Sequence, residues 1–229
     1  MATIAFKIQQ VSERIARACD AAQRPVASVT LLAVSKTQRP EAVREALAAG
    51  LTRFGENYVQ EALDKMAALA ERRAELEWHL IGPLQSNKTR AVAEAFDWVH
   101  SVDRLKLAER LSAQRPDSLP PLQVCLQVNI SGEASKSGVA PDELPALARA
   151  VAALPRLRLR GLMAIPEPAE GLAAQRKPHQ ALRELFERLR ADGLPLDTLS
   201  MGMTADLEAA VLEGATIVRV GTAIFGARG

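Results

Sequence analysis

Lys36 is the residue with the clearest chemical potential, because it closes the apolar, β-branched segment LLAVSK. Burial of a lysine favours its neutral form, and a neutral amine can attack an aldehyde or ketone to form a Schiff base. The alternative is a lysine whose apolar stem lies along the protein while its ammonium group reaches water. The segment therefore predicts either a Schiff-base lysine or an ordinary lysine at the end of a strand.

A second group of residues, near the C-terminal end of the chain, could bind an anion. Ser200, Gly202 and Thr204 occur in LSMGMTADLEAAV, and Gly221 and Thr222 follow the strand-like run TIVRV. Hydroxyl groups and the unpaired N–H groups at the start of a helix bind phosphate, often after the last two strands of a barrel. Ordinary helix caps and tight turns would use the same residue types.

Three polar residues lie inside or next to apolar segments. Arg219 stands between valines in IVRVG, so it needs an anionic or acceptor partner, and a core carboxylate is the alternative to a ligand. Asn57, in FGENYV, and His79, in EWHLIG, could face the same site, although a structural hydrogen bond is the simpler interpretation. A lysine nucleophile, an anion site and an internal cation together fit an aldehyde that carries a phosphate, and pyridoxal 5′-phosphate (PLP) is such a molecule.

Other polar residues receive no role from the sequence. His100 ends an apolar strand and His179 lies in a polar helical run. Lys136, in the SGEASKSG loop, is interpreted as a solvated loop lysine, and whether it binds PLP transiently stays open.

The elements that must position these residues alternate between short β-branched runs and runs rich in Ala, Leu, Glu and Arg. After a leading helix over about 4–22, we expect eight strands: Ser28–Ser35, Arg53–Gly55, Glu77–Ile81, Trp98–Ser101, Leu122–Ile130, Leu159–Ile165, Thr198–Met201 and Ile217–Val220. Helices are expected between them, among them Pro40–Ala49, Val59–Ala74 and Ala205–Leu212.

Strands that are apolar on both faces are typical of a parallel sheet covered by helices. Eight such units favour an α/β fold with one (β/α)8 TIM-type barrel, an extra N-terminal helix and a single domain over residues 1–229. A doubly wound open sheet is the alternative. Its usual G-x-G-x-x-G turn is absent, since the first turn here reads SKTQRP.

Composition excludes several classes of protein. The 229 residues are 48% hydrophobic and 24% charged, and 29 Lys+Arg against 27 Asp+Glu leave a net charge of only +2, which does not favour nucleic acid or a membrane surface. Cys19 and Cys125 are far apart in apolar segments, so we expect buried free thiols, without a disulfide or a metal. With no signal peptide or membrane span, a cytoplasmic monomer is expected.

The motifs occur in an order that resembles one family. LLAVSK, FGENYVQEALDK, WHLIGPLQSNK, VNISGEASKSG, GLMAIP, LSMGMTADLEAAV and VRVGTAIFGAR are similar to segments of the pyridoxal phosphate homeostasis protein family, over about Ser28 to Arg228. The resemblance implies the barrel of alanine racemase, PLP as cofactor, and a non-enzymatic role in vitamin B6 balance. PLP-dependent apoenzymes are possible recipients of the PLP.

The resemblance also implies roles for individual residues. It makes Lys36 the lysine that binds PLP as an aldimine, and it places Arg219 opposite the pyridine nitrogen. Asn57 and His79 match positions near the cofactor. It implies phosphate contacts for four residues: Ser200, Gly202, Gly221 and Thr222.

Two enzymatic functions remain as alternatives: a PLP-dependent amino-acid racemase, and a Schiff-base aldolase that needs no cofactor. A racemase needs an acid or base on each face of the substrate α-carbon, and Lys36 can serve only one. In alanine racemase the second base is a tyrosine associated with a further β-rich domain. The one tyrosine here, Tyr58, is expected to pack structurally. We therefore expect PLP binding with little or no turnover.

Overall fold

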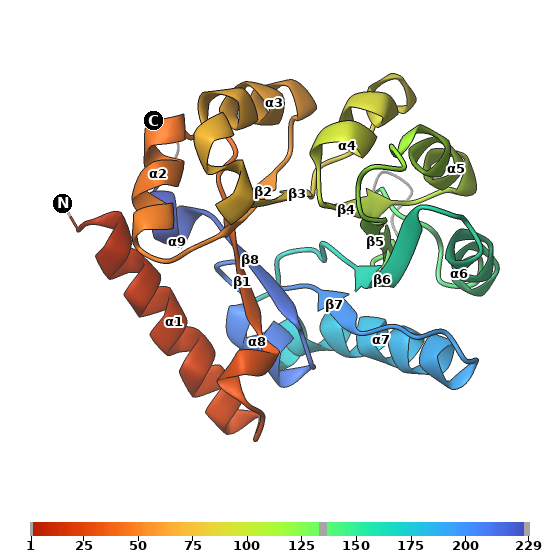
Figure 1. Ribbon diagram of the computed structural model, residues 1–229. Helices are drawn as coiled ribbons and strands as arrows, with labels where there is room; N and C mark the ends of the chain where they lie inside the picture. Colours follow the sequence, from red (N-terminus) through yellow and green to blue (C-terminus); the bar gives the residue numbers. More distant parts are fainter. Residues whose placement is uncertain (1, 133–136, 227–229) are drawn as a thin grey trace.

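The computed structural model describes residues 2–132 and 137–226, and its centre is a closed barrel of parallel strands. The strands follow one another around the barrel in chain order, and β1 pairs with both β2 and β8, which closes it (Figure 1). Lys136 lies outside the described residues. The strands are β1 (Thr30–Val34), β2 (Arg53–Glu56), β3 (Glu77–Leu80), β4 (Trp98–Val102), β5 (Leu122–Gln127), β6 (Leu157–Met163), β7 (Thr198–Ser200) and β8 (Ile217–Val220).

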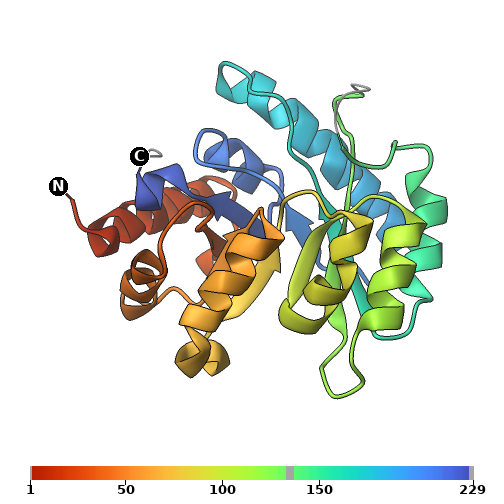
Figure 2. The ribbon, with the colours of Figure 1, turned by 90° about the horizontal axis from the view of Figure 1, so that it is seen from above.

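Helices surround the strands as a ring, which the two ribbon views show together (Figures 1 and 2). The first helix, α1, precedes the barrel and packs against α2, α8 and α9. This arrangement confirms the predicted TIM-type barrel with an extra N-terminal helix. The helices are α1 (Ile4–Ala21), α2 (Pro40–Ala48), α3 (Val59–Ala68), α4 (Thr89–Ala95), α5 (Leu105–Gln114), α6 (Leu144–Ala152), α7 (Leu172–Ala191), α8 (Leu207–Leu212) and α9 (Thr222–Phe225).

Two predicted elements are shorter than the sequence pattern indicated. The helix expected over Val59–Ala74 ends at Ala68, whose carbonyl accepts a hydrogen bond from the Arg44 guanidinium, and a 3₁₀ helix (Ala70–Glu75) follows. The fifth strand, expected to reach Ile130, ends at Gln127, and beyond it Val128 forms only an isolated bridge with Val139. In both places apolar residues continue past the end of the regular element, so periodicity alone overestimates its length.

The core has two parts. The larger part lies between the strands and the helices. The smaller part fills the inside of the barrel and consists of Leu32, Val34, Ile81, Trp98, Cys125, Met163 and Ile217. Both cysteines are buried and free, as predicted, and burial raises the pKa of the Cys125 thiol to about 12. Among the described residues, no helix is long and apolar enough to cross a membrane.

Candidate functional site

A cavity of about 460 Å³ opens at the carboxyl ends of the strands, where TIM barrels hold their functional residues. Five of the eight predicted site residues line it: Lys36, Asn57, Arg219, Gly221 and Thr222. They come from the loops after β1 and β2 and from β8 with the turn that follows it. Residues from opposite ends of the chain thus meet because β8 closes the barrel against β1.

Lys36 stands on a tightly held turn just after β1. The next residue, Thr37, has a φ of 64°, a left-handed conformation that is unfavourable for a β-branched side chain. Its N–H donates a hydrogen bond of 2.5 Å to a carboxylate oxygen of Glu61. On the other side of Lys36, the carbonyl of Ser35 accepts a hydrogen bond of 2.6 Å from the Lys65 Nζ. The backbone is therefore fixed on both sides of Lys36.

The turn is held by a buried charged cluster that the sequence analysis missed. Lys65, only 3% exposed, also donates to Glu56 at 2.8 Å and to Glu61 at 2.6 Å. The Ser35 hydroxyl donates to the same oxygen of Glu56 at 2.6 Å, while the second oxygen of Glu56 is buried and has no hydrogen-bond partner among the described residues. Burial raises the pKa of Glu56, and the nearby Lys65 acts against this shift. The sequence signal was available in FGENYVQEALDK, where Glu61 and Lys65 are one helical turn apart.

Arg219 is buried at the base of the cavity and bonds to neutral acceptors. Its Nη1 donates to the carbonyl and the hydroxyl of Ser200 at 2.6 and 2.7 Å, and its Nη2 donates to the carbonyl of Ala164 at 2.8 Å. Within the described part of the chain no carboxylate forms an ion pair with it, so the core-carboxylate alternative is not what the structure shows. Burial lowers the pKa of Arg219 to about 10, which leaves the guanidinium charged at neutral pH.

The wall of the cavity that follows β7 and β8 carries hydroxyl and backbone N–H groups. Thr204 and Thr222 line the cavity together with Gly221. Asp206 orients the Thr204 segment, because it accepts a hydrogen bond of 2.7 Å from the N–H of Met203 and lies 2.9 Å from the Nε2 of His179. This wall combines donors with the nearby positive charge of Arg219, which suits a phosphate group.

Three predicted residues do not line the cavity: His79, Ser200 and Gly202. His79 points into the barrel two residues before Ile81, and Ile81 does line the cavity. Because two strand residues span about 6.6 Å, His79 lies deeper in the barrel than the cavity. The Ser200 hydroxyl is fully buried against Arg219 and His100. At Gly202, φ is 90° and an added Cβ would lie 2.4 Å from the Ala210 side chain, so this glycine serves the packing of α8.

Asn57 lies between this cavity and a smaller one of about 250 Å³. Its side-chain oxygen is buried and has no hydrogen-bond partner within residues 2–132 and 137–226. Its backbone packs so closely on Gly82 that a Cβ there would come within 2.3 Å of the Asn57 carbonyl oxygen. The close approach fixes the loop after β2 against the loop after β3.

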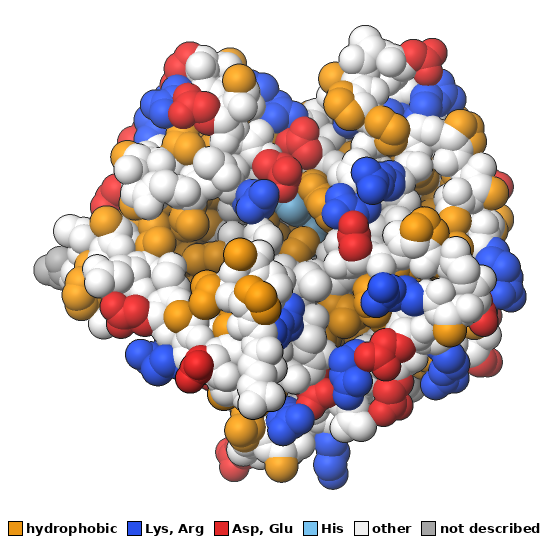
Figure 3. Space-filling view, turned by 60° about the horizontal axis from the view of Figure 1, so that its bottom comes forward, with side chains coloured by type: hydrophobic (Ala, Val, Ile, Leu, Met, Phe, Trp, Pro, Cys, Tyr) orange, Lys and Arg blue, Asp and Glu red, His pale blue; other side chains and the backbone are white. Residues whose placement is uncertain are grey.

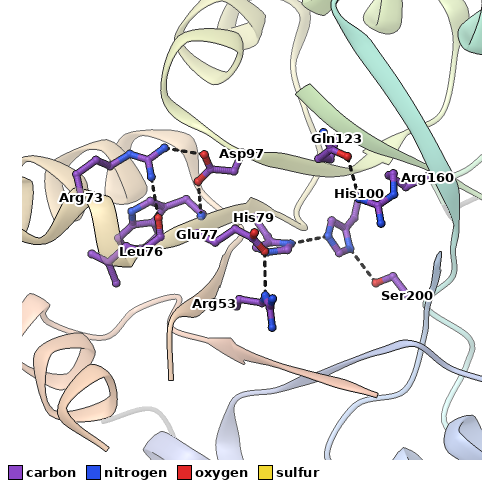
Figure 4. A network of polar contacts seen from close by, with 11 residues as sticks. Arg53, Arg73, Leu76, Glu77, His79, Asp97, His100, Gln123, Arg160 and Ser200 are labelled. Atoms are coloured by element: carbon purple, nitrogen blue, oxygen red, sulfur yellow. Dashed lines mark hydrogen bonds and ion pairs between the residues drawn. The ribbon is translucent and has the colours of Figure 1, made fainter. Parts of the chain in front are cut away.

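A second hollow, of about 1100 Å³, lies at the opposite mouth of the barrel. Figure 3 shows basic and acidic side chains gathered around a hollow in the surface. Most of these charges are paired: Arg53 with Glu77 at 3.1 Å, and Arg160 with Asp197 at 2.8 Å. His79 lines this hollow, and from it a series of polar contacts leads into the barrel (Figure 4).

Comparison with known proteins places the chain among PLP-associated proteins. Residues 8–229 match the family model "Alanine racemase, N-terminal domain". The chain is 66% identical over 228 residues to the pyridoxal phosphate homeostasis protein of Pseudomonas aeruginosa, covering 100% of this chain and 97% of that protein. The protein of the same name from Escherichia coli is 53% identical over 229 residues, covering 100% and 98%.

Solved structures also resemble this chain. PipY of Synechococcus elongatus, in a structure with PLP bound, is 42% identical with a TM-score of 0.82, covering 94% of this chain and 100% of that one. Alanine racemase from Corynebacterium glutamicum is 17% identical with a TM-score of 0.69, covering 95% of this chain and 60% of that one, and it shares the fold.

Proposed function

The chain belongs to the pyridoxal phosphate homeostasis protein family, and on that basis we propose that it binds PLP in the cavity at the carboxyl ends of its strands. The observation that carries the proposal is the convergence of Lys36, Arg219 and Thr222 on one cavity of about 460 Å³. An amine, a buried cation and a wall of phosphate donors are the groups that a phosphorylated pyridine aldehyde requires.

Each of these residues has a distinct task. When bound, PLP would supply an aldehyde as the electrophile, and Lys36 would supply the amine that meets it. Thr204, Gly221 and Thr222 would hold the phosphate through hydroxyl and backbone N–H groups. Arg219 would place its positive charge at the base of the cavity, and Ile81 and Ile165 would supply apolar contact from the side walls.

We place the physiological role in PLP balance, with little or no turnover of amino acids. Among the described residues that line the cavity, Lys36 is the only one whose side chain is of a type that commonly serves as a general acid or base. Tyr58 is 59% exposed and does not line the cavity. A site with one base can hold an aldehyde and release it to another amine, so a PLP-dependent apoenzyme is a suitable recipient. The protein acts as a monomer in this proposal.

Exchange of the α-proton tests the absence of turnover. The PLP-loaded protein is incubated with L- and D-alanine in deuterated water, and deuterium at the α-carbon is followed by NMR. We expect exchange far below ordinary enzyme rates of about 1–1000 per second. Exchange with racemisation at such rates would show that the protein is a racemase.

A further inference from the structure

Inside the barrel, a series of short hydrogen bonds joins Arg219 to the opposite mouth. Arg219 donates to the Ser200 hydroxyl at 2.7 Å, and that hydroxyl lies 2.8 Å from the Nδ1 of His100. The Nε2 of His100 lies 2.9 Å from the Nδ1 of His79, whose Nε2 lies 2.8 Å from a carboxylate oxygen of Glu77 (Figure 4). The series crosses the core from β8 through β7 and β4 to β3.

The chemistry of the two ends determines where every proton in the series lies. The Glu77 carboxylate can only accept, so with both rings neutral each histidine carries its proton on Nε2 and leaves its Nδ1 bare. The guanidinium can only donate, so the Ser200 oxygen accepts from Arg219, and the Ser200 proton points to the bare Nδ1 of His100. His100 therefore carries its proton on Nε2 and donates to the Nδ1 of His79. His79 then carries its proton on Nε2 and donates to Glu77, which accepts as a carboxylate.

The burial of these groups agrees with this order. His79 and His100 are at most 1% exposed, and burial lowers the pKa of both imidazoles, so both are neutral at pH 7. The hydrogen bond from His79 lowers the pKa of Glu77, which keeps that carboxyl ionised. All four hydrogen bonds run in one direction, and in this order each donor of the series faces an acceptor.

We infer that Ser200, His100 and His79 are positioning residues, which present a fixed acceptor to Arg219 and so hold its guanidinium toward the cavity. Because the Ser200 proton is committed to His100, a lone pair of the hydroxyl always faces the guanidinium. If His100 could not accept, the Ser200 hydroxyl would lose the partner that fixes its rotation, and its lone pair would no longer be held in one direction toward Arg219. The inference rests on the proposed function in one respect only, namely that PLP is the ligand in the cavity that Arg219 faces.

The proton order can be measured without any cofactor. The sequence has three histidines, so ¹⁵N-labelled protein gives few ring signals, and His79→Gln and His100→Gln assign two of them. At pH 7 we expect both His79 and His100 as neutral rings with the proton on Nε2 and a bare Nδ1. A proton on Nδ1 of His100, or a cationic ring at either position, would overturn the inference.

The effect on Arg219 has its own measurement. In the cofactor-free protein, the Nη1–H signal of Arg219, which donates to the Ser200 hydroxyl, should exchange with water at least tenfold faster in Ser200→Ala, while Ser200→Thr, which keeps the hydroxyl, should retain the slow exchange. His100→Phe should match Ser200→Ala, since it removes the acceptor but keeps an aromatic ring. Unchanged exchange in folded Ser200→Ala and His100→Phe would contradict the positioning role.

A PLP titration then separates this inference from the proposed function. We expect Ser200→Ala to bind PLP about tenfold more weakly and to shift its visible absorbance, with Ser200→Thr close to the natural protein. If the natural protein binds no PLP, the proposed function fails while the NMR results still decide the proton order. Wild-type affinity and absorbance in Ser200→Ala would contradict the inference alone.

Discussion

At Arg219 and Ser200, the sequence indicated the chemistry of each side chain but not the direction in which the side chain points. The sequence placed both residues at strands next to one another, and both do lie at the base of the site. The hydroxyl of Ser200 was expected to bind phosphate, yet it faces Arg219 inside the barrel. Successive strand residues point to opposite faces, so a displacement of one or two positions changes the surroundings of a side chain completely.

At the residue scale, Thr222→Val tests the phosphate wall. The change removes one hydroxyl donor to an anion and keeps the shape of the side chain, so we expect PLP affinity to fall by about 1.5–3 kcal/mol. Pyridoxal, which has no phosphate, should bind to the natural protein and the variant equally. The two titrations are compared with Thr52→Val, an exposed change at the opposite mouth. A similar loss for PLP and pyridoxal would contradict the assignment of this wall.

At the scale of elements, Lys65 joins three segments of the fold. It lies on α3, contacts Glu56 at the end of β2, and holds the turn between β1 and α2 through the Ser35 carbonyl. The cluster explains how a turn with a left-handed residue at Thr37 stays in place beside Lys36. The position of Lys36 therefore depends on α3 and β2, two elements that do not themselves line the cavity.

Lys65→Met should destabilise the protein and loosen the Lys36 turn. Removing one partner of a buried ion pair costs about 3–5 kcal/mol of unfolding free energy, measurable by urea denaturation. The additional change Glu56→Gln should recover part of this loss, because it removes the carboxylate left without a cation. Lys106→Met, at an exposed position on α5, is the matched control.

The Lys65→Met variant also distinguishes a positioning role of Lys65 from a general loss of folded structure. Pyridoxine 5′-phosphate carries the phosphate but no aldehyde, so its affinity should change little in folded Lys65→Met. The rate at which PLP develops its visible absorbance should fall. Equal losses for both ligands, or no loss for either, would contradict a role of Lys65 in holding the Lys36 turn.

The sequence predicted which strands are present better than it predicted the residues at which strands and helices end. Alternation of β-branched and helical runs was enough for eight strands in barrel order, because each run is apolar and bounded by turn residues. It could not separate His79 from Ile81, since both lie on the inward side of β3 and only their height along the barrel differs. It also missed the Lys65 cluster, because the partners meet only after β2 and α3 pack.

At the scale of the whole molecule, the barrel has a partly polar interior. His79, His100, Ser200 and Arg219 are buried among Leu32, Trp98 and the other apolar side chains that fill it. Such groups cost free energy unless each is hydrogen-bonded. Figure 4 shows those bonds for the two histidines and Ser200, and Arg219 donates to Ser200 and Ala164. The interior is therefore sensitive to any proton that the buried histidines would have to take up.

Stability should fall as the pH decreases from about 6.5 toward 5. Burial holds the pKa of His79 and His100 below the ordinary value of 6.5, so the unfolded chain binds protons in this range and the folded chain does not. The contribution is present above the unfolded pKa and is lost as pH falls, by up to about 1.4 kcal/mol per pH unit for each histidine.

Urea denaturation at several pH values measures this slope. The double variant His79→Gln and His100→Gln removes both groups, so its slope between pH 6.5 and 5 should be smaller than that of the natural protein. The difference between the two slopes isolates the histidines from the carboxylates that also titrate at lower pH. Identical slopes would show that these rings take up protons as readily in the folded protein as in the unfolded chain.

The central claim is that PLP binds covalently to Lys36, and one experiment tests it directly. The PLP-loaded protein is reduced with borohydride, digested, and mapped by mass spectrometry, with Lys36→Ala treated in parallel. We predict loss of the visible absorbance on reduction, a single pyridoxyl group on the peptide that contains Lys36, and no reducible absorbance of comparable intensity in the variant. A pyridoxyl group on a different lysine, or a full reducible absorbance in Lys36→Ala, would contradict the account.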